Sequence, residues 1–163
     1  MGIFDILFDK KRKMDYLDGV IYLFDMVWNK KTNYTPKNIL DVEYKLDLVS
    51  VVASYLDTKP QPKSVRVAST FGKDCINYGT VHAPRDFKDK FLPKCKERHL
   101  YFCDFLESKF NNNLDLTACE SIANEICSVN NIPVEQSILM AITQDVSSVI
   151  QKVDETLNTY NFL

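Results

Sequence analysis

Apolar side chains recur at alternating spacings of three and four positions along residues 36–57. This spacing places them on one face of an α-helix. Further apolar residues widen that face in the second half of the stretch, and the positions left polar form a narrow stripe: Glu43, Asp47, Ser50 and Ser54. A helix that is apolar over most of its circumference needs partners on several sides. The pattern therefore predicts a central helix over residues 36–57, enclosed by other helices.

The same periodicity predicts four further helices, over residues 13–30, 93–110, 117–129 and 133–159. A shorter helix is expected over residues 84–92, and Pro93 either breaks it or opens the next helix. No repeat, low-complexity stretch or linker divides the sequence. We therefore predict an all-α fold, a single-domain helical bundle of about five main helices over residues 1–163.

Residues 58–83 interrupt the helical pattern. The sequence KPQP at positions 59–62 cannot continue a helix. Valines at positions 65 and 67 then alternate with other residues, and Gly72 and Gly79 punctuate the second half of the segment. One interpretation is a β-hairpin that pairs residues 64–69 with 75–80, and the other is a short helix. We predict an irregular or β-hairpin insertion here, and the sequence leaves the choice between strand and helix open.

The composition is that of an ordinary globular protein, with 45% hydrophobic and 26% charged residues among 163. A formal net charge of −2 provides no global field that favours nucleic acid or an anionic membrane. Five cysteines, an odd number without a C-x-x-C pair, do not resemble a disulfide framework. The sequence has no secretory signal and no apolar run of about 18 residues that could span a membrane. We therefore expect a soluble cytoplasmic protein with free thiols, and its richness in Lys, Asn, Ile and Tyr is typical of AT-rich bacterial or phage genomes.

One set of residues has the chemistry of a metal site. Cys95, His99 and Cys103 are spaced by four positions, so they share one face of the predicted helix. Zn²⁺ takes thiolate and imidazole ligands, usually four of them in a structural site. The closely paired cysteines typical of such sites are absent, and a free cysteine is more often a core residue. We therefore predict no metal ion or other cofactor, and keep a metal or thiol site at these three residues as an alternative function.

A basic segment at residues 84–98 offers a second alternative, DNA binding. Its cations are Arg85, Lys88, Lys90, Lys94, Lys96 and Arg98. Acidic residues at positions 86, 89 and 97 dilute this cluster, which is typical of a solvated mixed-charge face, so nucleic acid is not the expected partner. Residues 2–13 join a short apolar stretch to a basic run, which suits either peripheral membrane contact or a short helix packed on the bundle.

No phosphate-binding glycine loop and no assembled set of nucleophile, base and oxyanion donors is visible in the sequence. We therefore expect no catalytic residues and no enzymatic activity. The leading hypothesis is a protein-binding module of the inhibitor, immunity or adaptor type, whose partner is another protein. Exposed aromatic residues commonly anchor such contacts, and the candidates in this sequence are Phe4, Phe8, Phe71 and Tyr78.

Overall fold

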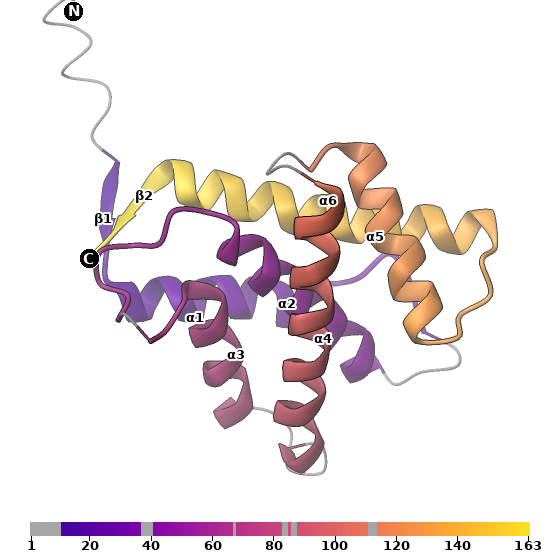
Figure 1. The fold of residues 1–163 in the computed structure, drawn as a ribbon, viewed down its shortest axis with the longest axis horizontal. Coiled ribbons are helices and arrows are strands. Elements are labelled where there is room, and N and C mark those ends of the chain that lie inside the picture. The colour runs from indigo at the N-terminus through magenta and orange to yellow at the C-terminus, as the bar shows by residue number, and fades with distance from the viewer. Residues whose placement is uncertain (1–10, 37–40, 67, 83–84, 86–87, 111–113) are drawn as a thin grey trace, which may run out of the picture.

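The computed structural model describes residues 11–36, 41–66, 68–82, 85, 88–110 and 114–163. Within them the chain forms six α-helices and two three-residue strands, β1 (Arg12–Met14) and β2 (Tyr160–Phe162) (Figure 1). The prediction of an all-α helical bundle is therefore confirmed. The predicted residues Phe4 and Phe8 and most of the 2–13 segment lie outside the described residues.

Helix α2 (Asp41–Asp57) is the central element, as predicted. Every residue from Leu46 to Leu56 is buried, because α1 (Tyr16–Trp28), α3 (Phe71–His82), α4 (Lys88–Lys109) and α6 (Gln136–Thr159) all pack against it. Pro36 is not helical, contrary to the predicted start at this residue, and residues 37–40 lie outside the described part of the chain.

The β-hairpin interpretation of residues 64–80 is wrong, because the second half of this segment forms helix α3. Thr70 starts the helix: its hydroxyl accepts from Lys73 N at 3.2 Å and its carbonyl from Asp74 N at 3.0 Å. Gly72 and Gly79, which suggested turns, instead permit close helix packing. A Cβ at Gly72 would collide with the Ala53 carbonyl of α2, and one at Gly79 with the Phe24 ring of α1. The described residues between positions 58 and 70 form neither helix nor strand, so the irregular part of the prediction holds there.

Helices α4, α5 (Leu116–Val129) and α6 complete the bundle. Figure 1 shows α1 and α6 lying lengthwise, while α3, α4 and α5 cross them. Helix α4 runs through Pro93 without a break, so one helix replaces the two segments expected on either side of this proline. Pro93 lies in the second turn, where its missing N–H removes a single hydrogen bond near the helix start.

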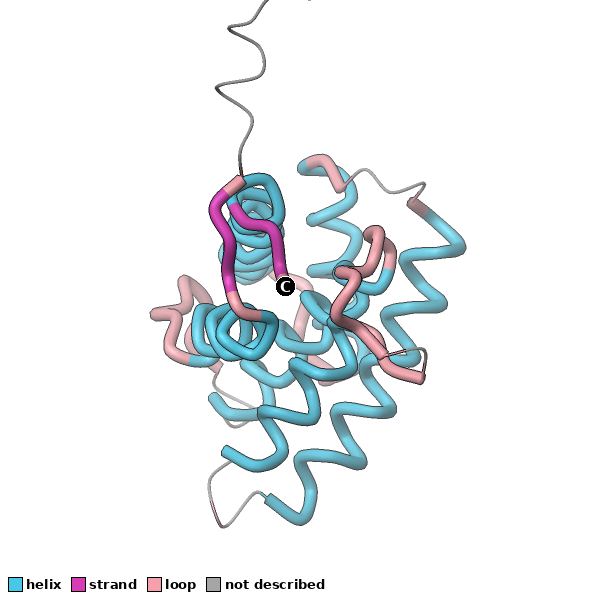
Figure 2. Tube along the Cα trace, turned by 90° about the vertical axis from the view of Figure 1, so that its left-hand side faces the viewer, coloured by secondary structure: helices cyan, strands magenta, loops and turns pink. Residues whose placement is uncertain are grey.

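The two strands join distant parts of the sequence at one end of the bundle. Strand β1 precedes α1 and β2 follows α6, and the two pair in parallel with Lys13 opposite Asn161. Figure 2 shows them side by side at the end of the molecule where the C-terminus lies. The Phe162 ring packs 5.0 Å from that of Phe71, which anchors β2 on the core.

One face of α2 is polar yet largely buried, and it faces α4. Its residues Glu43, Asp47, Ser50, Ser54 and Asp57 follow helical spacing and contact α4 along its length. We call this contact the polar seam. The narrow polar stripe seen in the sequence is therefore an interface between two helices rather than a solvated surface.

Candidate functional site

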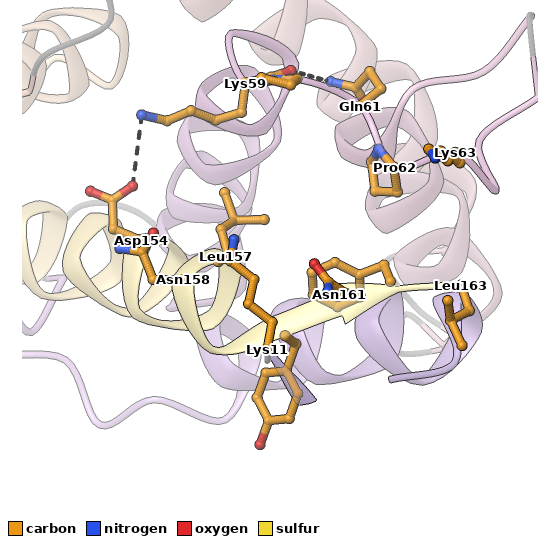
Figure 3. Close-up of a pocket in the computed structure, with 13 residues that line it drawn as sticks. Lys11, Lys59, Gln61, Pro62, Lys63, Asp154, Leu157, Asn158, Asn161 and Leu163 are labelled. Atoms are coloured by element: carbon orange, nitrogen blue, oxygen red, sulfur yellow. Dashed lines mark hydrogen bonds and ion pairs between the residues drawn. The ribbon is translucent and has the colours of Figure 1, made fainter. Parts of the chain in front are cut away.

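A hollow of about 630 Å³ lies beside β2, between this strand and the segment 59–63 (Figure 3). The end of α6 forms a further wall through Asp154, Leu157 and Asn158. The proline-rich segment stands away from β2 because its prolines cannot continue α2, and Gln61 holds it by donating to the carbonyls of Leu56 (3.0 Å) and Lys59 (2.9 Å). We refer to this cavity as the β2 hollow.

The strand edge that borders the β2 hollow is open within the described residues. Leu163 donates its amide to the Met14 carbonyl (3.0 Å), and its own carbonyl accepts from the Tyr16 amide (3.1 Å), so both groups face the β1 side. Backbone groups of successive strand residues point to opposite sides. The amide and carbonyl of Phe162 therefore point away from β1, where a further strand could pair with them.

The side chains that line the β2 hollow include three lysines and one carboxylate. Lys11 donates to the Leu157 carbonyl at 2.6 Å, and the ammonium group of Lys59 lies 3.7 Å from Asp154 (Figure 3). The Lys59 ammonium also lies 4.2 Å from the centre of the Tyr55 ring. Lys63 is exposed at the rim. The hollow is therefore biased towards a negatively charged ligand.

The aromatic residues expected to bind a partner are not on this surface. Phe71 is only 1% exposed, because it starts α3 against the rings of Tyr16 and Phe162. This burial removes it from any contact surface of the folded protein. Tyr78 is half-buried, between the rings of Phe24 and His82.

A second cluster of reactive groups lies where α2 ends against α4. His99 Nε2 lies 2.8 Å from Asp57 Oδ2, and Cys103 lies one turn further along α4. The donor atoms of these three residues lie within 4.8 Å of one another, and all three residues are partly buried. The structure thus brings together two of the three predicted metal ligands and replaces the third, Cys95, with Asp57.

Cys95 lies on the same helix but is fully buried beside Ser50 in the polar seam. Burial, together with the nearby charge of Asp47, raises the pKa of its thiol to about 12, so it remains protonated. The sequence did carry a signal for Asp57: a carboxylate at a helix C-terminus is opposed by the helix dipole and indicates a nearby cation. The position of Asp57 at a helix end does not, however, reveal which other helix supplies the cation.

The protonation of His99 follows from its two neighbours. Burial alone would lower the pKa of the ring, but its hydrogen bonds to Asp57 and Cys103 and their charges raise it to about 9. At neutral pH the imidazolium therefore pairs with Asp57. The cluster offers carboxylate oxygen, imidazole nitrogen and thiol sulfur, which are the ligand types of Zn²⁺ and the groups of a thiol nucleophile with its base.

The basic segment of α4 is partly used inside the molecule. Lys94 donates to Glu43 at 2.6 Å, and Arg98 Nε lies 3.2 Å from Asp47 Oδ1. The exposed cations that remain in the described part of this segment are those at positions 85, 88, 90 and 96. Pairing of two cations with acids of α2 weakens the argument for a DNA-binding surface.

No helix among the described residues is long and apolar enough to cross a bilayer. The predicted membrane contact of residues 2–13 falls mainly outside the described chain, within which residues 11–13 are exposed. Comparison with protein-family models, curated proteins and solved structures finds no match to this chain.

Proposed function

We propose that this protein is a non-enzymatic binding protein that receives an extended, acidic segment of another protein along the free edge of β2. The observation that carries the proposal is the open strand edge beside the lysine-lined β2 hollow. A contact of this kind is compatible with an inhibitor, an immunity protein or an adaptor.

Strand addition supplies both affinity and specificity. The amide and carbonyl of Phe162 offer main-chain hydrogen bonds to an incoming strand. Alternate side chains of that strand would point into the hollow, whose volume of about 630 Å³ accommodates more than one of them. The ammonium groups of Lys11, Lys59 and Lys63 favour acidic side chains at the rim.

The lining also supports a binding role over a catalytic one. None of the described residues around the β2 hollow is a serine, threonine, cysteine or histidine. The hollow therefore lacks the nucleophile and base pair on which most acyl-transfer enzymes depend.

The test is selection from a random peptide library, with peptides of about eight residues, which span roughly 26 Å as a strand. We expect enrichment of acidic sequences whose binding shifts the amide NMR signal of Phe162. Charge reversal by Lys63→Glu should weaken the selected peptides about fivefold, because each exposed ion pair contributes up to about 1 kcal/mol. Lys31→Glu, at an exposed lysine outside the hollow, is the matched control.

Methylation of alternate backbone nitrogens removes their N–H donors, and it can be applied to either of the two alternating sets of peptide residues. Only one set faces β2, so methylation of that set should abolish binding and methylation of the other set should not. The proposal is wrong if the library yields no binder. It is also wrong if Lys31→Glu weakens binding as much as Lys63→Glu does.

A further inference from the structure

We propose that Asp57, His99 and Cys103 bind one Zn²⁺ ion, with a water molecule completing a tetrahedral site. The inference stands apart from the proposed function, because none of these residues lines the β2 hollow. It replaces the ligand set expected from the sequence: Cys95 is buried beside Ser50 and is not part of the group of converging donor atoms, and Asp57 takes its place.

The three donors converge from two helices. His99 and Cys103 are four residues apart on α4, so their side chains project from one face, and Asp57 faces them from the last position of α2. Their donor atoms lie within 4.8 Å of one another. Zn²⁺ needs about 2.0–2.3 Å to each ligand, so small side-chain rotations suffice to enclose it.

A second observation points to a cation at this site. Asp57 Oδ1 is buried and has no hydrogen-bond partner among the described residues, while Oδ2 bonds His99. A buried carboxylate oxygen without a donor is costly, and the C-terminal end of the α2 dipole adds to that cost. A divalent ion bound by this carboxylate would offset both the missing hydrogen bond and the negative end of the helix dipole.

The surroundings hold the ligands in place. Gly72 lies so close that a Cβ there would be 2.7 Å from Asp57 Oδ1, which limits rotation of the carboxylate. Ser54 donates to the His99 backbone carbonyl at 3.0 Å, which fixes α4 against α2 at this point. Positioning of this kind around the ligands contributes strongly to metal affinity.

The donor set selects the kind of ion. One sulfur and one nitrogen exclude the hard cations Mg²⁺ and Ca²⁺, which prefer oxygen ligands, and favour Zn²⁺ or Co²⁺. Three protein ligands leave one position for water. A thiol enzyme would use the same residues, but it needs a substrate cavity beside them, and the β2 hollow is not lined by any of the three.

The first test is calorimetric titration of the untagged full chain with Zn²⁺ at about pH 8, where the ligands deprotonate more readily. We expect one ion per chain, and an affinity that falls at least about 100-fold in His99→Gln and in Cys103→Ser. His82→Gln is the matched control, because His82 is the other histidine of the sequence and lies exposed on α3. Its affinity should equal that of the wild type.

Two measurements on the wild-type protein avoid dependence on the folding of variants. Co²⁺ should give the visible spectrum of a tetrahedral site with a thiolate-to-metal band in the near ultraviolet. Zn²⁺ should slow alkylation of Cys103 and leave the other four cysteines unchanged, as read by mass spectrometry. The inference is overturned if no ion binds, if His82→Gln loses affinity as His99→Gln does, or if Cys103 is not protected.

Discussion

Replacement of Asp145 by alanine should be among the most damaging single changes in this protein. This carboxylate on α6 is fully buried and accepts hydrogen bonds from the Asn33 amide (2.8 and 3.0 Å), the Asn33 side chain (2.9 Å), the Tyr34 amide (3.1 Å) and the Tyr44 hydroxyl (2.9 Å). It thereby ties the segment after α1, and the first turn of α2, to the last helix.

The magnitude follows from the donors that alanine leaves without an acceptor. Asn33 is exposed, so water can replace Asp145 at that residue. Tyr34 and Tyr44 are buried, and each buried donor left unpaired costs about 1–3 kcal/mol. We therefore expect Asp145→Ala to lower the free energy of unfolding by about 3–5 kcal/mol, within the range found when one partner of a buried charged pair is removed.

The measurement is urea denaturation followed by circular dichroism, arranged as a double-mutant cycle with Tyr44→Phe. Tyr44→Phe alone should cost about 1–2 kcal/mol, and the double variant should cost less than the sum by about 1 kcal/mol or more. Tyr22→Phe, at a tyrosine that is 45% exposed, serves as the control and should change stability by less than about 0.5 kcal/mol. A loss below about 1 kcal/mol in Asp145→Ala, or additivity within about 0.5 kcal/mol, would refute this reasoning.

Three further predictions concern other buried groups. Burial raises the pKa of Asp47 to about 6 despite the hydrogen bond from Asn130 and the nearby charge of Arg98, so the folded state binds a proton more tightly than the unfolded chain and stability should fall as pH rises from about 4 to about 6. Asp47→Asn should flatten that slope, and an unchanged slope in urea denaturation at several pH values would contradict this assignment. Gly72→Ala should cost about 2–3 kcal/mol in thermal or urea unfolding, because the new methyl group meets the rigid backbone of α2. Gly19→Ala should cost less, because its new methyl group meets aromatic side chains, mainly the ring of Phe162, and no backbone atom. In the native protein Cys103, which is partly exposed, should be alkylated at least about 10-fold faster than Cys75, a residue that is 2% exposed and whose thiol pKa is raised by burial. Equal rates by mass spectrometry would contradict this prediction and show that the protein opens around α3.

The local pattern of apolar residues was enough to predict that α2 is a central helix. Nearly its whole circumference is apolar, and a helix of this kind is stable only when it is buried. The same reasoning failed for α3. Its glycines are used for contact with Ala53 and Phe24, and a contact of that kind leaves no mark on local periodicity. The alternation of valines at positions 65 and 67 added a false β signal to a segment whose described residues form no strand.

Pairing between distant segments was the other source of error. Strands β1 and β2 are three residues each and lie at opposite ends of the described chain, so neither carries a period that sequence could reveal. The cluster of Asp57, His99 and Cys103 was predicted in part. Helical spacing correctly put His99 and Cys103 on one face of α4, but it also included Cys95, and the third group, Asp57, comes from another helix.

The polar seam connects the basic segment of α4 with the cluster of Asp57, His99 and Cys103. Along α2 the acids Glu43 and Asp47 meet Lys94 and Arg98 at the start of the seam, so two of the six cations that suggested a nucleic-acid surface serve to orient α4. At the far end Asp57 meets an imidazole and a thiol instead of a lysine or arginine. A buried carboxylate requires a compensating cation, and lysine or arginine supplies it permanently at one end. At the other end the charge that faces Asp57 is the proton on His99, which a Zn²⁺ ion bound as proposed above would replace. The contact between α4 and α2 is therefore held by permanent charges at its start and by a titratable group at its end.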